Sequence, residues 1–324
     1  MAKYDFSKYK DIPAPPSSPM IELAKPKTSW VQQRKWDIPD VFVIKVAPVG
    51  AFLMKGDNPN QKYTTKEIRN EILESLEAGA CAFHTHVRDE RGVHTLEIQL
   101  YHELIDSIKE KYGRNVLVCG CPEGGTTIAE SLNPIVEFKG IIETAPITVT
   151  CVNLTGNFVV SMTPELVKAH VEVMQDMGCK PEIVLHNVGD ISMVKRWLID
   201  TGLLQKPYSF RLAIGNPGWA YIEDPYSMVD CVSFMMRELK KIDPECAIMV
   251  DMAGRAGLYI IALAIELGAY GARVGMEDTL WMYPHKDEKI RDNKSVVKAV
   301  ATLAETLGRK PGTADDYRRF IGLM

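Results

Sequence analysis

Two histidines, His84 and His86, are the residues whose types and spacing are best suited to metal chemistry. They follow a run of small and apolar residues, 80–83, without a helix breaker, which predicts a β-strand. Because side chains alternate between the faces of a strand, both imidazoles and Arg88 point to the same side. Zinc favours such nitrogen ligands, and a catalytic zinc keeps a position open for water or substrate. We therefore predict a metal site with Arg88 as a substrate contact; the alternative is one core histidine and one that hydrogen-bonds a loop.

A second charged cluster, Arg273 to Asp278, ends another apolar segment. By alternation Arg273 and Glu277 share one face, while Val274 and Met276 take the other. A buried arginine and a buried glutamate are costly unless they are paired or used. Glu277 could complete a zinc site of two histidines and one carboxylate, and a salt bridge between Arg273 and Glu277 is the alternative.

Other predicted strand ends offer weaker candidates. His186 could face the pocket or be a satisfied core histidine, and we leave both readings open. Thr150 could hydrogen-bond a substrate carboxylate, although a β-branched strand residue is the commoner explanation. Gly254 and Arg255 follow a late strand, where barrels often bind phosphate, and predict part of a coenzyme site.

These residues require a scaffold that brings several strand ends together. The segments predicted as strands are 41–47, 80–87, 116–121, 147–152, 183–187, 210–214, 247–251 and 272–276, and a predicted helix follows each. This alternation predicts an α/β fold, a (β/α)8 TIM barrel, in which the active site lies where the strands end. A doubly wound sheet is the alternative, but no Gly-x-Gly-x-x-Gly follows the first strand.

Residues 1–40 differ from the barrel predicted over 41–324, because their proline-rich segment 13–19 suits neither a helix nor a central strand. We expect an extended arm that Trp30 and Trp36 dock on the protein itself or on a neighbouring subunit.

Composition narrows the function classes. The chain has 324 residues, 46% of them hydrophobic, and a net charge of −4, so nothing indicates nucleic acid or a membrane as partner. Seven cysteines, an odd number, indicate reduced thiols and a cytoplasmic location.

From about Val41 to the C-terminus the chain resembles the β-keto acid cleavage enzymes. The resemblance rests on His84-Thr85-His86-Val87-Arg88-Asp89, on Arg273-Val274-Gly275-Met276-Glu277-Asp278, and on Ala47-Pro48-Val49-Gly50-Ala51, Asn58-Pro59-Asn60, Glu77-Ala78-Gly79-Ala80 and Gly254-Arg255. It implies a zinc-dependent (β/α)8 barrel that forms a homo-oligomer, a tetramer or a dimer. The implied reaction converts a β-keto acid and acetyl-CoA into acetoacetate and a new acyl-CoA.

The resemblance also implies roles for single residues. His84, His86 and Glu277 would bind zinc, Arg273 and Asp278 would form the catalytic pair, and Thr150 would lie against the substrate. Zinc on the keto oxygen would act as a Lewis acid. Because an arginine is a poor base, we expect Asp278 to tune Arg273, which stabilises negative charge.

The chain departs from the family at several positions. Val184 stands where the family often has a strand-five glutamate, and Phe52 stands where the named enzyme, the 3-keto-5-aminohexanoate cleavage enzyme, has another glutamate. A serine of the third strand is replaced near Cys119 to Cys121, which we expect to be core residues. These changes argue against an amino-bearing substrate and favour a more apolar acyl group. The rival functions are a metal-dependent hydrolase of the amidohydrolase kind and a non-catalytic binding protein.

Overall fold

The computed structural model describes residues 4–12, 34–154, 158–216, 222 and 224–324. The chain divides into two units, Met1–Asp37 and Ile38–Met324. In the first unit, η1 (Ser7–Tyr9) is a single short turn, and Trp36 is 81% exposed. Trp30 and the proline-rich segment 13–19 lie outside the described residues. Docking of the arm therefore stays a prediction, as does its boundary with the barrel.

The second unit is a closed barrel of parallel strands, which confirms the predicted TIM fold. Its strands, in the order in which they pair, are β1 (Val41–Val46), β2 (Ala82–His84), β5 (Leu117–Cys119), β6 (Ile142–Thr148), β9 (Lys180–Leu185), β10 (Ser209–Leu212), β11 (Ala247–Asp251) and β12 (Gly271–Val274). Strand β12 pairs with β1 and closes the ring. All carboxyl ends of these strands therefore open at the same mouth.

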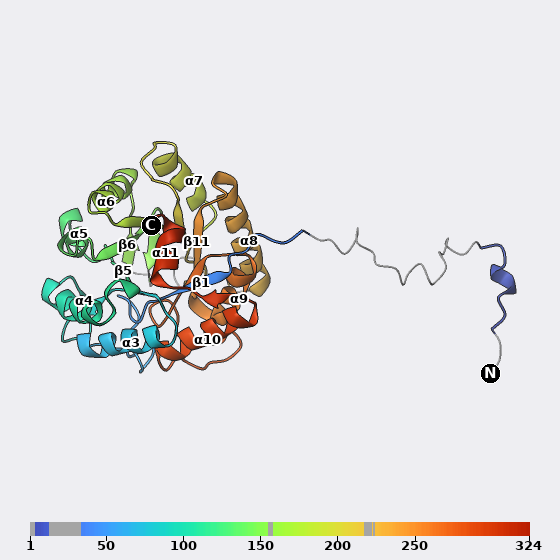
Figure 1. Cartoon of the computed structure of the whole chain (residues 1–324), viewed down its shortest axis with the longest axis horizontal. Coiled ribbons are helices and arrows are strands. Elements are labelled where there is room, and N and C mark those ends of the chain that lie inside the picture. The colour runs from blue at the N-terminus through green and yellow to red at the C-terminus, as the bar shows by residue number, and fades with distance from the viewer. Residues whose placement is uncertain (1–3, 13–33, 155–157, 217–221, 223) are drawn as a thin grey trace. The chain divides into compact units, whose positions relative to one another are not determined.

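Helices surround the strands (Figure 1). They are α3 (Thr65–Glu77), α4 (Ile98–Tyr112), α5 (Ile128–Glu137), α6 (Pro164–Asp176), α7 (Asp190–Val194), α8 (Pro225–Ile242), α9 (Leu258–Glu266) and α10 (Asn293–Thr306). Two short 3-10 turns, η2 (Gly113–Asn115) and η4 (Gly254–Ala256), and the π-helical segment η3 (Lys195–Ile199) extend or precede three of them. A capping box of Thr64 and Glu67 opens α3. No helix among the described residues is long and apolar enough to cross a membrane.

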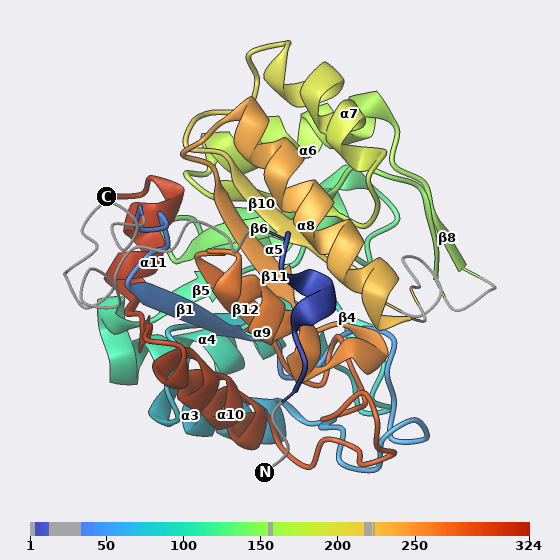
Figure 2. The same cartoon turned by 90° about the vertical axis from the view of Figure 1, so that its right-hand side faces the viewer.

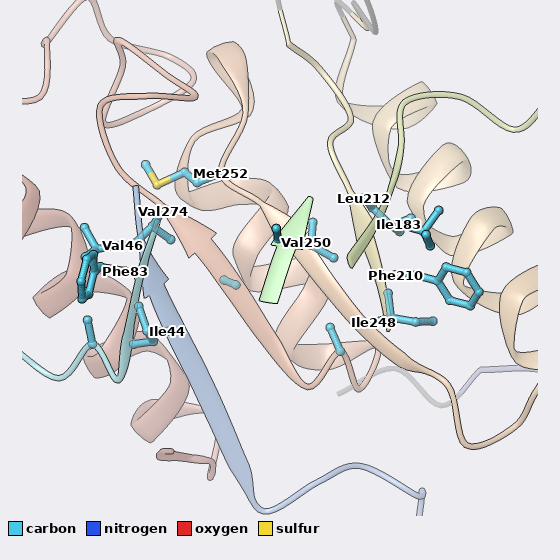
Figure 3. Packing of buried hydrophobic residues seen from close by; sticks show 14 of the residues in the cluster. Ile44, Val46, Phe83, Ile183, Phe210, Leu212, Ile248, Val250, Met252 and Val274 are labelled. Carbon is cyan, nitrogen blue, oxygen red and sulfur yellow. The ribbon is translucent and has the colours of Figure 1, made fainter. Parts of the chain in front are cut away.

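Apolar residues on the outer faces of the strands pack against this ring of helices. Val46 lies beside Phe83 in the pairing of β1 with β2, and Ile183 lies beside Phe210 in the pairing of β9 with β10 (Figure 3). All four side chains are fully buried. Burial of a side chain of this size stabilises the fold by roughly 1.5–3 kcal/mol. The opposite faces of the strands are thereby left for polar residues inside the barrel.

The C-terminal helix α11 (Ala314–Ile321), which the sequence analysis did not predict, lies across the strands in the view of Figure 1. Its Tyr317 is fully buried in a cluster with Val43, Leu117 and Met249. The short β13 (Lys310–Pro311) pairs with β1 just before it. This helix therefore closes the amino-terminal end of the barrel.

Two hairpins lie outside the barrel strands. One joins β3 (Val87–Arg88) to β4 (His94–Thr95), and the other joins β7 (Val152–Leu154) to β8 (Phe158–Val160). Strand β8 lies at the margin of the molecule in the view of Figure 2.

Several predicted strand boundaries are wrong, and two of the errors affect candidate site residues. The strand predicted over 147–152 is β6, which ends at Thr148, because the chain then leaves the barrel for the β7–β8 hairpin. The first part of this strand was not predicted because it contains Pro146, which has no N–H to donate to a neighbouring strand. The strand predicted through Val87 ends at His84, and Arg88 belongs to a separate hairpin.

Candidate active site

The three predicted metal ligands converge at the mouth of the barrel. His84 lies at the end of β2, His86 two residues later, and Glu277 in the turn after β12. The Nε2 atoms of the two histidines are 3.2 Å apart. Glu277 Oε1 lies 3.6 Å from Nε2 of His84 and 3.3 Å from Nε2 of His86. Three donor atoms from opposite ends of the sequence thus share one small space.

The spacing of these atoms fits a zinc ion. In a tetrahedral site with bonds of about 2.0–2.2 Å, neighbouring ligand atoms lie about 3.3–3.6 Å apart. The second oxygen of Glu277, Oε2, is buried and has no hydrogen-bond partner among the described residues. A further candidate is Cys121, whose sulfur lies within 4.8 Å of the ligand atoms of both histidines. This cysteine is buried, as the sequence predicts for a core residue.

A second layer of contacts orients the two imidazoles. Nδ1 of His86 lies 3.2 Å from Nδ1 of His94, and Nε2 of His94 lies 3.1 Å from the carbonyl oxygen of Glu123. If His94 carries its proton on Nε2, that N–H donates to the carbonyl oxygen of Glu123. Nδ1 of His94 can then accept a hydrogen bond from Nδ1–H of His86. Nε2 of His86 would then carry a lone pair for a metal. Nδ1 of His84 faces Cys119 Sγ at 3.4 Å.

Burial keeps the imidazoles of His84 and His94 neutral. It lowers the pKa of His84 well below the ordinary value, although Glu277 acts in the opposite direction. Burial, assisted by His86, lowers the pKa of His94 to about 4. Neutral imidazole is the form that binds metals.

Arg273 and Asp278 form a two-bond ion pair beside the histidines. Nε and Nη2 of Arg273 donate to the two oxygens of Asp278 at 2.7 Å each, and Nη2 also lies 2.5 Å from Glu277 Oε1. Burial opposes the charge of Arg273, but Asp278 and Glu277 raise its pKa well above the ordinary value. Burial raises the pKa of Asp278, against the effect of Arg273. The guanidinium is therefore a fixed cation, and the salt bridge considered as an alternative coexists with the ligand cluster.

A further ion cluster fills the barrel below. Lys45 Nζ donates to both oxygens of Glu182 at 2.6 and 2.7 Å, and Arg211 Nη1 donates to Glu182 Oε2 at 3.2 Å. Arg211 Nε also lies 3.1 Å from Asp251 Oδ2. Although burial opposes its ionisation, Lys45 and Arg211 hold the pKa of Glu182 at about 2. Burial raises the pKa of Asp251 to about 7, with Arg211 opposing it. Strand β9 therefore carries a carboxylate at Glu182, two residues before Val184, where the family often has a glutamate.

A cavity of about 410 Å³, which we name the metal-side cavity, opens above these groups. Its lining includes the predicted ligands, Arg273 and Asp278. Much of the remaining wall is apolar and is formed by Ala51, Phe52, Leu53, Pro146, Ala213, Leu280 and Trp281. The metal-side cavity is therefore an apolar pocket with a few charged groups at its base, as expected of a small-molecule site.

The structure brings two of the weaker candidates to this cavity. His186 lines it, with Nε2 3.3 Å from Thr148 Oγ1, and burial lowers its pKa to about 3. Gly254 also lines it. Arg255 instead stacks on Trp281 at 3.7 Å and donates to Lys286 O and Asp287. Its role toward a coenzyme stays a prediction.

Arg88 and Thr150 lie outside the lining of the metal-side cavity. Arg88 is buried and donates to the carbonyl oxygens of Gly50, Leu53 and Gly92 at 2.6, 2.8 and 3.1 Å. The hydroxyl of Thr150 hydrogen-bonds to Asp190. Their roles as substrate contacts stay predictions, and the contacts of Arg88 favour a structural role in holding loop 50–53.

Sequence reasoning missed Arg211, Asn216 and His94. Arg211 and Asn216 line the metal-side cavity, and His94 contacts His86. Alternation from the end of β10 could have placed Arg211 and Ala213 inside the barrel. His94 gave no such signal, because it lies in the hairpin strand β4, outside the barrel strands.

A parallel barrel with its polar groups at the carboxyl ends of the strands is the arrangement of TIM-barrel enzymes. The profile of the β-keto acid cleavage enzyme family matches residues 42–323. The protein therefore belongs to the family of β-keto acid cleavage enzymes.

Characterised relatives agree with this assignment. The chain is 30% identical over 285 residues to the 3-keto-5-aminohexanoate cleavage enzyme of Fusobacterium nucleatum subsp. nucleatum, covering 87% of this chain and 98% of that enzyme. It is 26% identical over 305 residues to the 3-dehydrocarnitine:acetyl-CoA trimethylamine transferase of Rhizobium meliloti, covering 88% and 97%. The apo structure of ObcA superposes with a TM-score of 0.70 at 18% identity, covering 82% of this chain and 66% of ObcA. This last likeness concerns the fold alone.

Proposed function

We propose that the protein is a zinc-dependent acyltransferase that converts a β-keto acid and acetyl-CoA into acetoacetate and a new acyl-CoA. The observation that carries this proposal is the convergence of His84 Nε2, His86 Nε2 and Glu277 Oε1 within 3.6 Å of one another. Relatives named as transferases that use acetyl-CoA support the reaction class. An amidohydrolase-like reaction finds no support in these relatives.

The proposed ligands are His84, His86 and Glu277, which are closer together than the set that includes Cys121. When bound, the zinc ion would supply a Lewis acid for the keto oxygen. Arg273, fixed by Asp278, would stabilise the negative charge that develops beside it. The apolar walls would exclude water from this charge.

The cations at the base of the metal-side cavity suit the acid's carboxylate. Arg211 lines the cavity and is held from behind by Glu182 and Asp251, so its position is fixed before a ligand arrives. We assign Arg211 to the carboxylate of the β-keto acid. Phe52, 38% exposed at the wall, favours an apolar acyl group over an amino-bearing one.

Other parts of the proposal concern the setting of the reaction. All seven cysteines carry free thiols, which supports a reducing, cytoplasmic location. We also propose a homo-oligomer, a tetramer or a dimer, on the basis of the family resemblance. Light scattering of the purified protein would measure its mass and test this point.

The test of the function is a panel of β-keto acids incubated with acetyl-CoA and the zinc-loaded protein. We expect acetoacetate and a new acyl-CoA from acids with apolar acyl groups. A His84→Ala variant that retains the wild-type melting profile serves as the control and should give no product. Absence of acetoacetate across a broad panel, with zinc bound, would contradict the proposal.

A further inference from the structure

A second cavity adjoins the metal-side cavity. It has a volume of about 580 Å³ and lies between the loop after β5, the end of β6 and helix α6; we name it the side cavity. The two cavities share four lining residues, Ala51, Phe52, Glu123 and Pro146. A molecule that fills the side cavity can therefore present one end to the proposed metal ligands. The proposed metal ligands and the arginines of the metal-side cavity do not line this space.

The side cavity offers no cationic side chain to an anion among its described residues. Its described lining contains no lysine and no arginine, and its one carboxylate is that of Glu123. Much of the wall is apolar, with Ile128, Leu166 and Met162 among its members. The start of α5 also lines the cavity, but there the N–H of Thr126 already donates to the carboxylate of Glu130, and the N–H of Glu130 to the hydroxyl of Thr127. A phosphate or carboxylate would lose its hydration here without gaining a cationic side chain. The lining therefore selects a neutral chain.

His170 gives the side cavity a specific polar contact. The residue is 5% exposed and lines the cavity from α6. Its Nδ1 lies 2.8 Å from the carbonyl oxygen of Leu166, so Nδ1 carries the proton and donates it there. Burial lowers the pKa of His170, which keeps the ring neutral. The remaining ring nitrogen, Nε2, has no hydrogen bond within the described part of the chain, and it is left as an acceptor for an N–H or O–H group of a ligand.

We propose that the side cavity binds the neutral, amide-bearing arm of the thioester co-substrate, the pantetheine portion of acetyl-CoA, and directs its acetyl end toward the metal-side cavity. This inference rests on the proposed function. The arm carries amide N–H and hydroxyl donors for His170 Nε2, and apolar methyl groups for the wall that contains Leu166. The charged acid is assigned to the metal-side cavity, where Arg211 and Arg273 lie. The nucleotide phosphates would remain outside the side cavity.

The experiment compares ligand binding to wild type and to Leu166→Trp, which fills the side cavity. Isothermal titration would use three probes on zinc-loaded protein: S-acetyl-pantetheine, the unreactive S-(2-oxopropyl) thioether of CoA, and acetoacetate. We expect Kd for both pantetheine compounds to rise at least about tenfold, and Kd for acetoacetate to change by less than about twofold. Leu307→Trp, at a surface residue that lines neither cavity, is the matched control and should behave as wild type.

A second variant tests the polar contact. His170→Phe removes the acceptor with little change of volume, and we expect pantetheine binding to weaken by about 3- to 10-fold, the effect of one hydrogen bond. If Leu166→Trp does not fold, the loss of pantetheine binding in His170→Phe tests the proposed site in its place.

Several outcomes would overturn the inference. These are wild-type affinity for both pantetheine compounds in the variants, a loss confined to the CoA compound, an equal loss for acetoacetate, or no binding of either compound to wild type. Because binding is measured without turnover, the result is separate from the proposed function. A protein that binds the thioester compounds as expected but forms no acetoacetate would refute the function and keep this site.

Discussion

Replacing Lys45 by methionine tests the ion cluster that supports the active site. Lys45 is fully buried, and its Nζ donates to both oxygens of Glu182. After the replacement, Glu182 still accepts from Arg211 at 3.2 Å and from the hydroxyl of Tyr317 at 3.1 Å. Removal of one partner of a buried ion pair costs roughly 3–5 kcal/mol. Because two partners remain, we expect Lys45→Met to lose about 3 kcal/mol of unfolding free energy.

The reciprocal change should be worse. Glu182→Gln leaves the ammonium of Lys45 without a carboxylate. Its partners are then the neutral amide oxygen of the new side chain, the hydroxyl of Tyr317 at 3.2 Å and the sulfur of Cys119 at 3.8 Å. The replacement also leaves Arg211 with Asp251 as its remaining carboxylate in the cluster. We therefore expect a loss of about 5 kcal/mol, near the upper limit for such pairs, together with lower activity through Arg211.

Urea denaturation of the two single variants and of the double variant would measure these losses. The double variant should lose less than the sum of the single losses, because the two residues interact directly. Lys111→Met is the control, since its ion pair with Glu77 is at the surface, and its urea midpoint should match wild type. A loss below about 1 kcal/mol in Lys45→Met, or full additivity, would refute the reasoning.

Three further predictions follow from single contacts. Gly50→Ala places a Cβ 2.3 Å from Glu277 Cγ, so it should displace the carboxylate and weaken zinc binding at least about tenfold by competition with a chelator; unchanged affinity would contradict this. Arg88→Lys cannot serve the three carbonyls that Arg88 holds, so the melting temperature and kcat/KM should both fall; a change in KM alone, at wild-type stability, would instead favour substrate contact. Because burial raises the pKa of Asp251 to about 7, the folded chain holds a proton that the unfolded chain has lost above about pH 4, and stability from this group falls as pH rises from about 4 to 7. Asp251→Asn should flatten that decline in melting temperature; a slope equal to that of wild type would count against the assignment.

The sequence predicted the barrel and the convergence at its mouth because both depend on local patterns. Alternation in the sequence predicts one side for His84 and His86 and the inner side for Glu277. In the structure β2 ends at His84 and β12 at Val274, so His86 and Glu277 reach the mouth from the segments that follow these strands. Closure of the barrel then brings these strand ends together, as the TIM fold requires. No knowledge of side-chain packing was needed for this step.

The ion cluster inside the barrel could not be predicted in the same way. Lys45 and Glu182 are 137 residues apart, and each stands alone in its strand without a motif around it. The position of Arg88 outside the cavity lining was not predicted for a different reason. Strand β2 ends at His84, so the alternation of side chains no longer applies at Arg88. The hydrophilic sequence of α11 gave no sign that Tyr317 is buried. Its burial depends on the packing of α11 against the amino-terminal end of the barrel.

X-ray absorption at the zinc edge, combined with metal analysis of the isolated protein, tests the central claim most directly. If His84, His86 and Glu277 hold the ion, we expect about one zinc per chain, with nitrogen and oxygen neighbours at about 2.0–2.1 Å. A sulfur neighbour at about 2.3 Å would instead place Cys121 in the ligand set. That result, or the absence of zinc from the isolated protein, would contradict the account.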